Sequence, residues 1–129
     1  MSTLKADTIQ STGGGAATLT KQMALRAWVN FDGTGTIAAR DSLNLSSLTD
    51  NGTGEYTITY SSAWSAVDYA FTGCSGQDSS GSRTTGGITF DDNRSTPSTT
   101  AHRIVSRKKN TESNVDCPNE HCHVVGDLA

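Results

Sequence analysis

Apolar and polar side chains alternate along much of this chain with the two-residue period of β-strands. The alternation is clearest over residues 27–31 and 56–60, and it recurs more weakly over 37–39, 67–71, 88–90, 101–106 and 122–124. No long window shows the 3.6-residue apolar period of an amphipathic helix. The pattern therefore predicts an all-β chain of short strands.

Turn residues separate the predicted strands. Asp32 to Gly35 predicts a hairpin after the first strand, because glycine tolerates the positive φ of tight turns. Asp50-Asn51-Gly52 predicts a second hairpin, between the leucines of 43–48 and the strand at 56–60. Regular turns between short strands are typical of antiparallel sandwiches and barrels. We expect an antiparallel, jelly-roll-like β-sandwich over residues 23–129.

Two polar segments interrupt the second half of the chain. Residues 74–87 and 91–100 are rich in Ser, Gly and Thr and contain no core-forming side chains, so we expect them to be loops. The strand before the first loop is expected to end at Gly73. The strand over 101–106 has apolar residues on both faces, and the closing strand places Cys122 and Val124 on one face.

The N-terminal segment, residues 1–22, differs in character from the rest. It is small and polar, with a triple glycine at 13–15 and isolated apolar residues at Leu4, Ile9 and Leu19. Such a segment cannot form a core by itself. It is either a disordered leader or an attachment arm that orders against a partner or sister chains.

Composition favours association between copies. Only 33% of the 129 residues are hydrophobic and 6% are aromatic. A domain of this size buries only about two-thirds of its unfolded surface, and a thin core does little to offset the entropy of folding. Burial between identical subunits would supply the difference, so a homo-oligomer is expected.

Net charge and hydropathy exclude several partners. The formal charge of −3 argues against nucleic-acid binding, which normally needs a basic excess. One basic cluster (Arg103, Arg107, Lys108 and Lys109) lacks interleaved aromatic residues. It is interpreted either as a solvated strand end or as a patch for an anionic ligand. No apolar run approaches a membrane span and the first residues do not resemble a signal peptide, so synthesis in a cytoplasm and no membrane insertion are expected.

The segment CPNEHCH (117–123) resembles a metal site. Its spacing differs from that of the usual zinc-binding Cys and His motifs. In a strand, the side chains of His121 and His123 would point to the face opposite that of Cys122. Four interpretations remain open: a structural zinc, a Cys117–Cys122 disulfide, ordinary thiols, or a ring of His121 and His123 around a three-fold axis. No cofactor is expected, and the two histidines are weak candidates for metal ligands.

No catalytic constellation is recognisable. The sequence has neither a G-x-S-x-G elbow nor a P-loop. Asp91 and Asp92 could in principle hydrolyse a glycan, but adjacent carboxylates in a polar loop are typically solvated. We expect that the protein is not an enzyme.

Several segments together resemble one protein family. MSTLKADTIQSTGGGA resembles the start of tail-fibre and related virion proteins of phages that infect cyanobacteria and other marine bacteria. The stretch AWVNFDGTGTIAARDSLNLSSLTDNGTGEYTITYSSAW resembles the β-rich module that follows there, and HVVGDL resembles its terminal strand. The likeness is specific over residues 26–72 and weak over 74–119.

The resemblance implies a virion structural protein, a homotrimer tied to tail or capsid proteins through Leu4, Ile9 and Leu19. It also implies that Trp28, Val29 and Phe31 are core or subunit-interface residues. A short tail fibre whose polar loops contact a host-surface glycan is one hypothesis, and a capsid decoration or adaptor protein is the alternative. The candidate host contacts are Trp64, Arg83, Asp91, Asp92 and Arg94. Trp64 is otherwise expected to be a core residue beside a hairpin.

Overall fold

The computed structural model describes residues 13, 25–76, 85–90, 96–108 and 111–129. Eight β-strands cover most of them: β1 (Ala27–Asp32), β2 (Ala38–Leu43), β3 (Leu45–Gly52), β4 (Glu55–Tyr60), β5 (Ala70–Ser75), β6 (Thr85–Phe90), β7 (Ala101–Lys108) and β8 (Glu120–Val125). These ranges contain no helix, and hence none long and apolar enough to cross a membrane.

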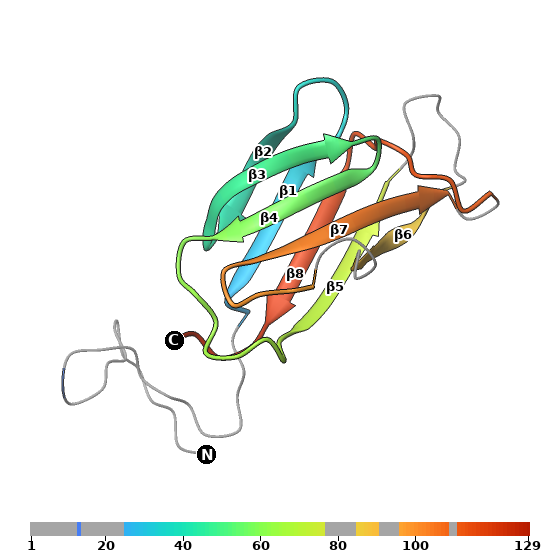
Figure 1. Cartoon of the computed structure of the whole chain (residues 1–129). Coiled ribbons are helices and arrows are strands. Elements are labelled where there is room, and N and C mark those ends of the chain that lie inside the picture. The colour runs from blue at the N-terminus through green and yellow to red at the C-terminus, as the bar shows by residue number, and fades with distance from the viewer. Residues whose placement is uncertain (1–12, 14–24, 77–84, 91–95, 109–110) are drawn as a thin grey trace, which may run out of the picture.

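The strands form two antiparallel sheets of four. One has the order β2-β1-β8-β5 and the other the order β3-β4-β7-β6, and Figure 1 shows them as two layers. The ring of Phe31 in β1 meets that of Tyr56 in β4 edge-on, with 5.0 Å between their centroids. The interior therefore lies between the layers, as the alternating pattern predicts.

The first predicted strand is confirmed at residue level. Ala27, Val29 and Phe31 are buried, and Trp28 and Asn30 on the other face are half-buried. β1 pairs with β2 along one side and with β8, about 90 residues further along the chain, along the other. That second pairing places the first and the last of the described strands side by side in one sheet.

The second hairpin forms, but its turn lies later than the sequence suggests. Asp50, Asn51 and Gly52 belong to β3, Gly52 pairs with Glu55, and the chain reverses at Thr53 and Gly54. Gly54 has a φ of +65°, and its amide donates to Asp116 Oδ1 at 2.6 Å. The hydrogen bond to Asp116, which is distant in sequence, and the left-handed backbone of Gly54 together place the turn at Thr53 and Gly54. The turn therefore lies two residues beyond the predicted triplet.

Two predicted boundaries in the second half are wrong. The strand expected over 67–71 is β5, which begins at Ala70 and runs through Gly73 to Ser75. Val67 is 57% exposed, and β6 begins inside the expected loop. β5 pairs with β8 and β6 pairs with β7, so contacts distant in sequence extend the strands into segments of low β propensity.

An aromatic cluster fills one end of the interior. The buried imidazole of His102 lies among aromatic rings with centroids 5.2–5.9 Å from its own, those of Tyr60, Tyr69, Phe71 and Phe90. These rings come from β4, β5, β6 and the segment before β5, so both sheets contribute. Because apolar side chains are scarce in this sequence, a few rings supply much of the buried surface.

The prediction of an all-β fold with antiparallel sheets is confirmed. The jelly-roll-like connectivity, the trimer and the attachment arm stay predictions. The proposed arm, 1–22, lies outside the described residues apart from Gly13.

Candidate functional site

Most of the residues predicted to make functional contacts lie outside the described part of the chain. They are Leu4, Ile9 and Leu19 of the arm and Arg83, Asp91, Asp92 and Arg94 of the polar loops. Their roles stay predictions.

Trp64 is a core residue and not a surface residue. Its side chain is 1% exposed and packs against the rings of Tyr60 and Tyr69, with centroids 5.2 and 5.3 Å away. Its amide donates to the carbonyl of Thr99 at 2.8 Å. The suggested host contact is therefore wrong for Trp64 in this structure, and the alternative interpretation, a core tryptophan beside a hairpin, is correct. Of the two tryptophans, Trp28 is the more accessible.

The closing strand alternates as predicted. Glu120, Cys122 and Val124 of β8 point into the interior, whereas His121 is half-buried and His123 is exposed. Among the described residues no three His, Cys, Asp or Glu side chains are placed to hold a metal ion. Cys117 and Cys122 are both buried, and neither they nor Cys74 form a disulfide.

The outward face of the β2-β1-β8-β5 sheet is polar and carries one indole side chain, that of Trp28. Trp28 pairs with His123, and Asn30 pairs with His121. The Nδ2 group of Asn30 lies 3.0 Å from Nδ1 of His121, within hydrogen-bond distance. One ring nitrogen of His121 thus already has a partner within the chain.

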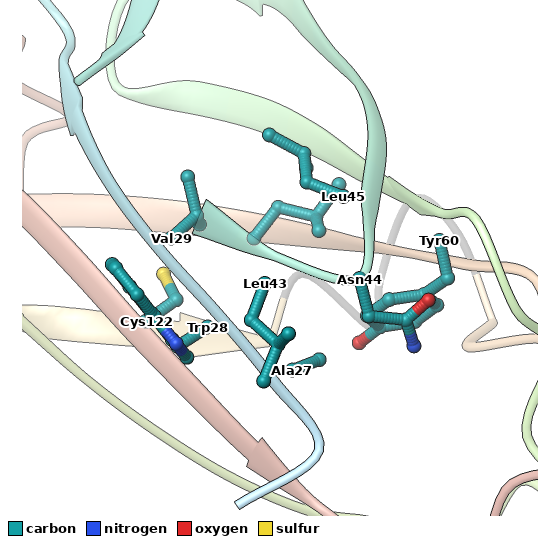
Figure 2. Close-up of a pocket in the computed structure, with 9 residues that line it drawn as sticks. Ala27, Trp28, Val29, Leu43, Asn44, Leu45, Tyr60 and Cys122 are labelled. Atoms are coloured by element: carbon teal, nitrogen blue, oxygen red, sulfur yellow. The ribbon is translucent and has the colours of Figure 1, made fainter. Parts of the chain in front are cut away.

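An apolar slot opens at one edge of the molecule, where β2 and β3 meet. Each of these strands is the outermost of its own sheet, and the slot lies where the chain passes from one to the other through Asn44. Its walls are Ala27, Trp28, Val29, Leu43, Asn44, Leu45, Ile58, Tyr60 and Cys122. Figure 2 shows Val29 and Cys122 to one side of Leu43 and Tyr60 to the other.

The backbone at Asn44 creates this opening. Asn44 joins β2 to β3 with a φ of +59°, a conformation that asparagine tolerates better than most residues. Its side chain accepts from the amide of Ser62 at 2.6 Å and donates to the carbonyl of Ser62 at 3.1 Å. This connection turns the chain from one sheet to the other and leaves Leu43 at the rim.

The size and lining of the slot define what it can accept. The slot holds about 10 Å³ of space, roughly enough for one water molecule. Sites for small organic ligands usually measure about 300–1,000 Å³. Leu25 and Leu43 are 42% and 46% exposed, and both belong to the chain beside the slot. The slot is therefore too small for a ligand, and the exposed leucines beside it suit contact with the surface of another polypeptide.

The structure also contains charged groups that the sequence did not reveal as buried. Glu55 is 6% exposed; it forms an ion pair with Arg103 and accepts from Nδ2 of Asn114 at 2.7 Å. Arg103 belongs to the basic cluster that was interpreted as solvated or anion-binding. In the structure its guanidinium is instead part of an internal ion pair.

Glu120 is a buried carboxyl at the other end of the interior. Its side chain is fully buried, and burial raises its pKa to about 8, although Ser106 and Cys117 nearby lower it and Asp116 raises it further. Neither carboxyl oxygen has a hydrogen bond of good geometry. Glu120 is therefore protonated in the folded protein at neutral pH. The alternation with Cys122 and Val124 could have predicted that Glu120 points into the interior. Its carboxyl charge, however, predicts a solvent-exposed position.

Comparison with known proteins gives no match: no family model matches the chain, and neither a curated protein nor a solved structure does. The functional argument therefore depends on the residues themselves.

Proposed function

We propose that this chain is a virion structural protein, a short trimeric tail fibre or fibre-like appendage of a phage. In this proposal residues 1–22 attach it to the particle, and the β-sheet domain is displayed for contact with a host-surface glycan. The resemblance of the N-terminal segment and of residues 26–72 to phage appendage proteins motivates the proposal. It involves no catalytic step, no cofactor and no nucleic acid.

The observation that carries the proposal is the apolar slot at the β2–β3 edge. Free edge strands promote association with other chains unless they are covered, and this edge has two exposed leucines, Leu25 and Leu43, beside it. Its position also matters, because β1 begins there, with Ala27 and Trp28 in the wall of the slot. A surface of this kind suits contact between subunits, which the low apolar content of the chain also favours.

A trimer would place three such edges around one axis. The heterologous contact of a closed ring joins two different surfaces of each subunit. The apolar edge with Leu25 and Leu43 on one subunit and a different surface on the next would meet that requirement. The polar outward face with Trp28, Asn30, His121 and His123 would then remain for contacts outside the trimer.

Capsid decoration or an adaptor role is the second candidate function. The apolar β2–β3 edge also favours this role, because a decoration protein could bind a neighbouring capsid protein through it. The two roles differ in position and copy number: tens of copies at the tail are expected for a fibre and hundreds over the capsid for a decoration protein.

Labelled antibodies against the chain, viewed by electron microscopy on purified particles, test the proposal. Label at the tail together with tens of copies by quantitative mass spectrometry is the expected result. Label over the capsid with hundreds of copies would favour the decoration role. Absence of the chain from purified particles would contradict both.

A further inference from the structure

Residues 113–119, which we call the strap, connect β7 to β8 and run across one end of the domain (Figure 1). Apart from a single bridge between Asn114 and Arg107, the strap forms no β-ladder. Two of its side chains point inward, those of Val115 and Cys117, which are 7% and 0% exposed. The strap therefore closes this end of the interior without belonging to either sheet.

Separate hydrogen bonds hold the strap to turns and strand ends of both sheets. Asp116 Oδ1 accepts from the amide of Gly54 at 2.6 Å and from the hydroxyl of Tyr56 at 3.0 Å, and Arg40 donates to the carbonyl of Pro118. The backbone bonds, at 2.7–3.0 Å, are Lys108 N to Ser113 O, Val115 N to Ser106 O, Gly33 N to Cys117 O and Gly76 N to Asn119 O. Because such scattered bonds break at lower cost than a sheet ladder, the strap can open while both sheets stay paired.

The carboxyl of Glu120 lies in the interior beside the strap. Glu120 is the first residue of β8 and is 0% exposed. In register it lies opposite Phe31 of β1 and Ser75 of β5, neither of which carries a charge. Burial raises its pKa to about 8, against a smaller lowering by Ser106 of β7 and Cys117 of the strap.

No positive charge offsets a carboxylate at this position. The groups that act on the pKa of Glu120 include no cation among the described residues, and Asp116 of the strap raises that pKa further. The charge of Glu120 acts in turn on Tyr56 of β4 and Cys122 of β8. Arg40, which contacts the strap from outside, is 42% exposed and already forms a surface ion pair.

We propose that loss of the Glu120 proton opens the strap, so that this end of the domain responds to pH. A carboxylate in the closed interior is costly without water or a compensating cation. Its repulsion acts on Asp116, the residue that anchors the strap to Gly54 and Tyr56. Opening the strap hydrates Glu120 while the sheets stay intact. The inference concerns the single domain and does not depend on the proposed function.

Linkage gives the size of the effect. Glu120 keeps its proton up to about pH 8 while the strap is closed, but only up to about pH 4.5 once it is exposed to water. Opening therefore releases a proton between these values, and the open fraction rises about tenfold per pH unit. Above about pH 8 the rise levels off, because the carboxyl is already ionised in the closed state.

Thiol labelling measures the opening, because Cys117 is buried under the strap. The native chain and Glu120→Gln are treated with iodoacetamide from pH 6 to 8.5 in buffers with EDTA, and peptide mass spectrometry gives the rate at each cysteine. Cys74 is exposed and supplies the reagent's own dependence on pH. Cys122, 1% exposed within β8, reports unfolding of the whole domain. Glu112→Gln is the matched control, the same chemical change at an exposed position.

The expected rate at Cys117, relative to Cys74, rises about tenfold per pH unit up to about pH 8 in the native chain and in Glu112→Gln. In Glu120→Gln that rise should disappear. Cys117 should also react faster than Cys122 at every pH. Equal rates at these two cysteines would show that the whole domain unfolds, and an unchanged rise in Glu120→Gln would assign the opening to another group. Either result would overturn the inference.

Hydrogen exchange of the native chain tests the strap without any variant. The amide of Val115 bonds to the carbonyl of Ser106, whereas Ile104 lies in β7, between two other strands of its sheet. The protection of Val115 should fall as the pH rises from 6 to 8 and remain below that of Ile104 throughout. Equal protection of the two amides would contradict separate opening of the strap.

Discussion

The hydroxyl of Tyr60 and Nδ1 of His102 lie 2.6 Å apart inside the aromatic cluster. His102 is 1% exposed, and burial lowers its pKa to about 4. The imidazole is therefore neutral in the folded protein at any pH well above that value. A neutral ring that shares one hydrogen bond with a phenol costs less to bury than a charged ring, which explains how a histidine is accommodated inside the aromatic cluster.

Replacing Tyr60 with Phe should destabilise the domain by about 1–3 kcal/mol, because Nδ1 of His102 is left buried without its partner. Urea unfolding followed by tryptophan fluorescence would give the change in the free energy of unfolding. Tyr69→Phe is the matched control, since its hydroxyl donates to the carbonyl of Ser98 in a partly exposed position. An equal loss in both variants would contradict a special role for the pair.

Glu120 should make the domain less stable as the pH rises. The pKa of its carboxyl is raised from 4.5 to about 8 in the folded state, so between these values the folded protein binds the additional proton and stability falls with increasing pH. His102 acts oppositely, but only between about pH 4 and 6.5. Glu120 thus dominates from pH 6.5 to 8.5, with a loss on the order of a few kcal/mol.

Glu120→Gln should abolish that decline, since a neutral amide of similar shape has no proton to lose. Thermal unfolding of both proteins at pH 6.5 and 8.5 is the measurement. The variant should be the more stable of the two at pH 8.5. A wild-type decline that persists unchanged in the variant would assign the effect to other groups.

Arg103→Met should cost about 3–5 kcal/mol, because it removes the cation beside the buried carboxylate of Glu55. The exposed pair of Arg40 and Asp32, joined at 3.0 Å with side chains 42% and 36% exposed, provides the comparison. Arg40→Met should cost about 1 kcal/mol or less. Chemical denaturation of the two variants tests the difference, and similar losses would count against it.

Gly54→Ala should be far more damaging than Gly35→Ala. Both glycines have a left-handed φ, +65° and +63°, so both variants acquire about 1–2 kcal/mol of backbone strain. A Cβ at Gly54 would also lie 2.6–2.8 Å from backbone atoms of Ser106 and Val115, whereas a Cβ at Gly35 meets nothing within 4 Å. Expression yield and unfolding midpoint of the two proteins should separate them. Equal effects would show that φ alone matters.

The sequence predicted those parts of the fold that depend on local alternation. The inward set of Ala27, Val29 and Phe31 and the outward position of His123 followed from the two-residue period alone. The boundaries of β5 and β6 did not, because they depend on pairing with β8 and β7. A single sequence gives no signal for such distant partners.

The candidate site was less predictable for a related reason. The slot exists because Asn44 carries the chain between two sheets while β2 and β3 both remain at free edges. Leu43 and Leu45 looked like ordinary strand residues in the sequence. Trp64 lies outside the eight strands, in a stretch without clear alternation of apolar and polar residues. The two-residue period therefore could not predict whether its side chain is exposed or buried.

The measurement that tests the central claim most directly is the solution mass of this 129-residue chain by light scattering, compared with that of the variant Leu43→Asp. We expect the native chain at three times its mass of 13.5 kDa and the variant at the monomer mass, with Val67→Asp still trimeric. A chelator should leave the native mass unchanged, and dissociation by the chelator would instead favour a ring of His121 and His123. A native protein that is monomeric at all concentrations would contradict the account.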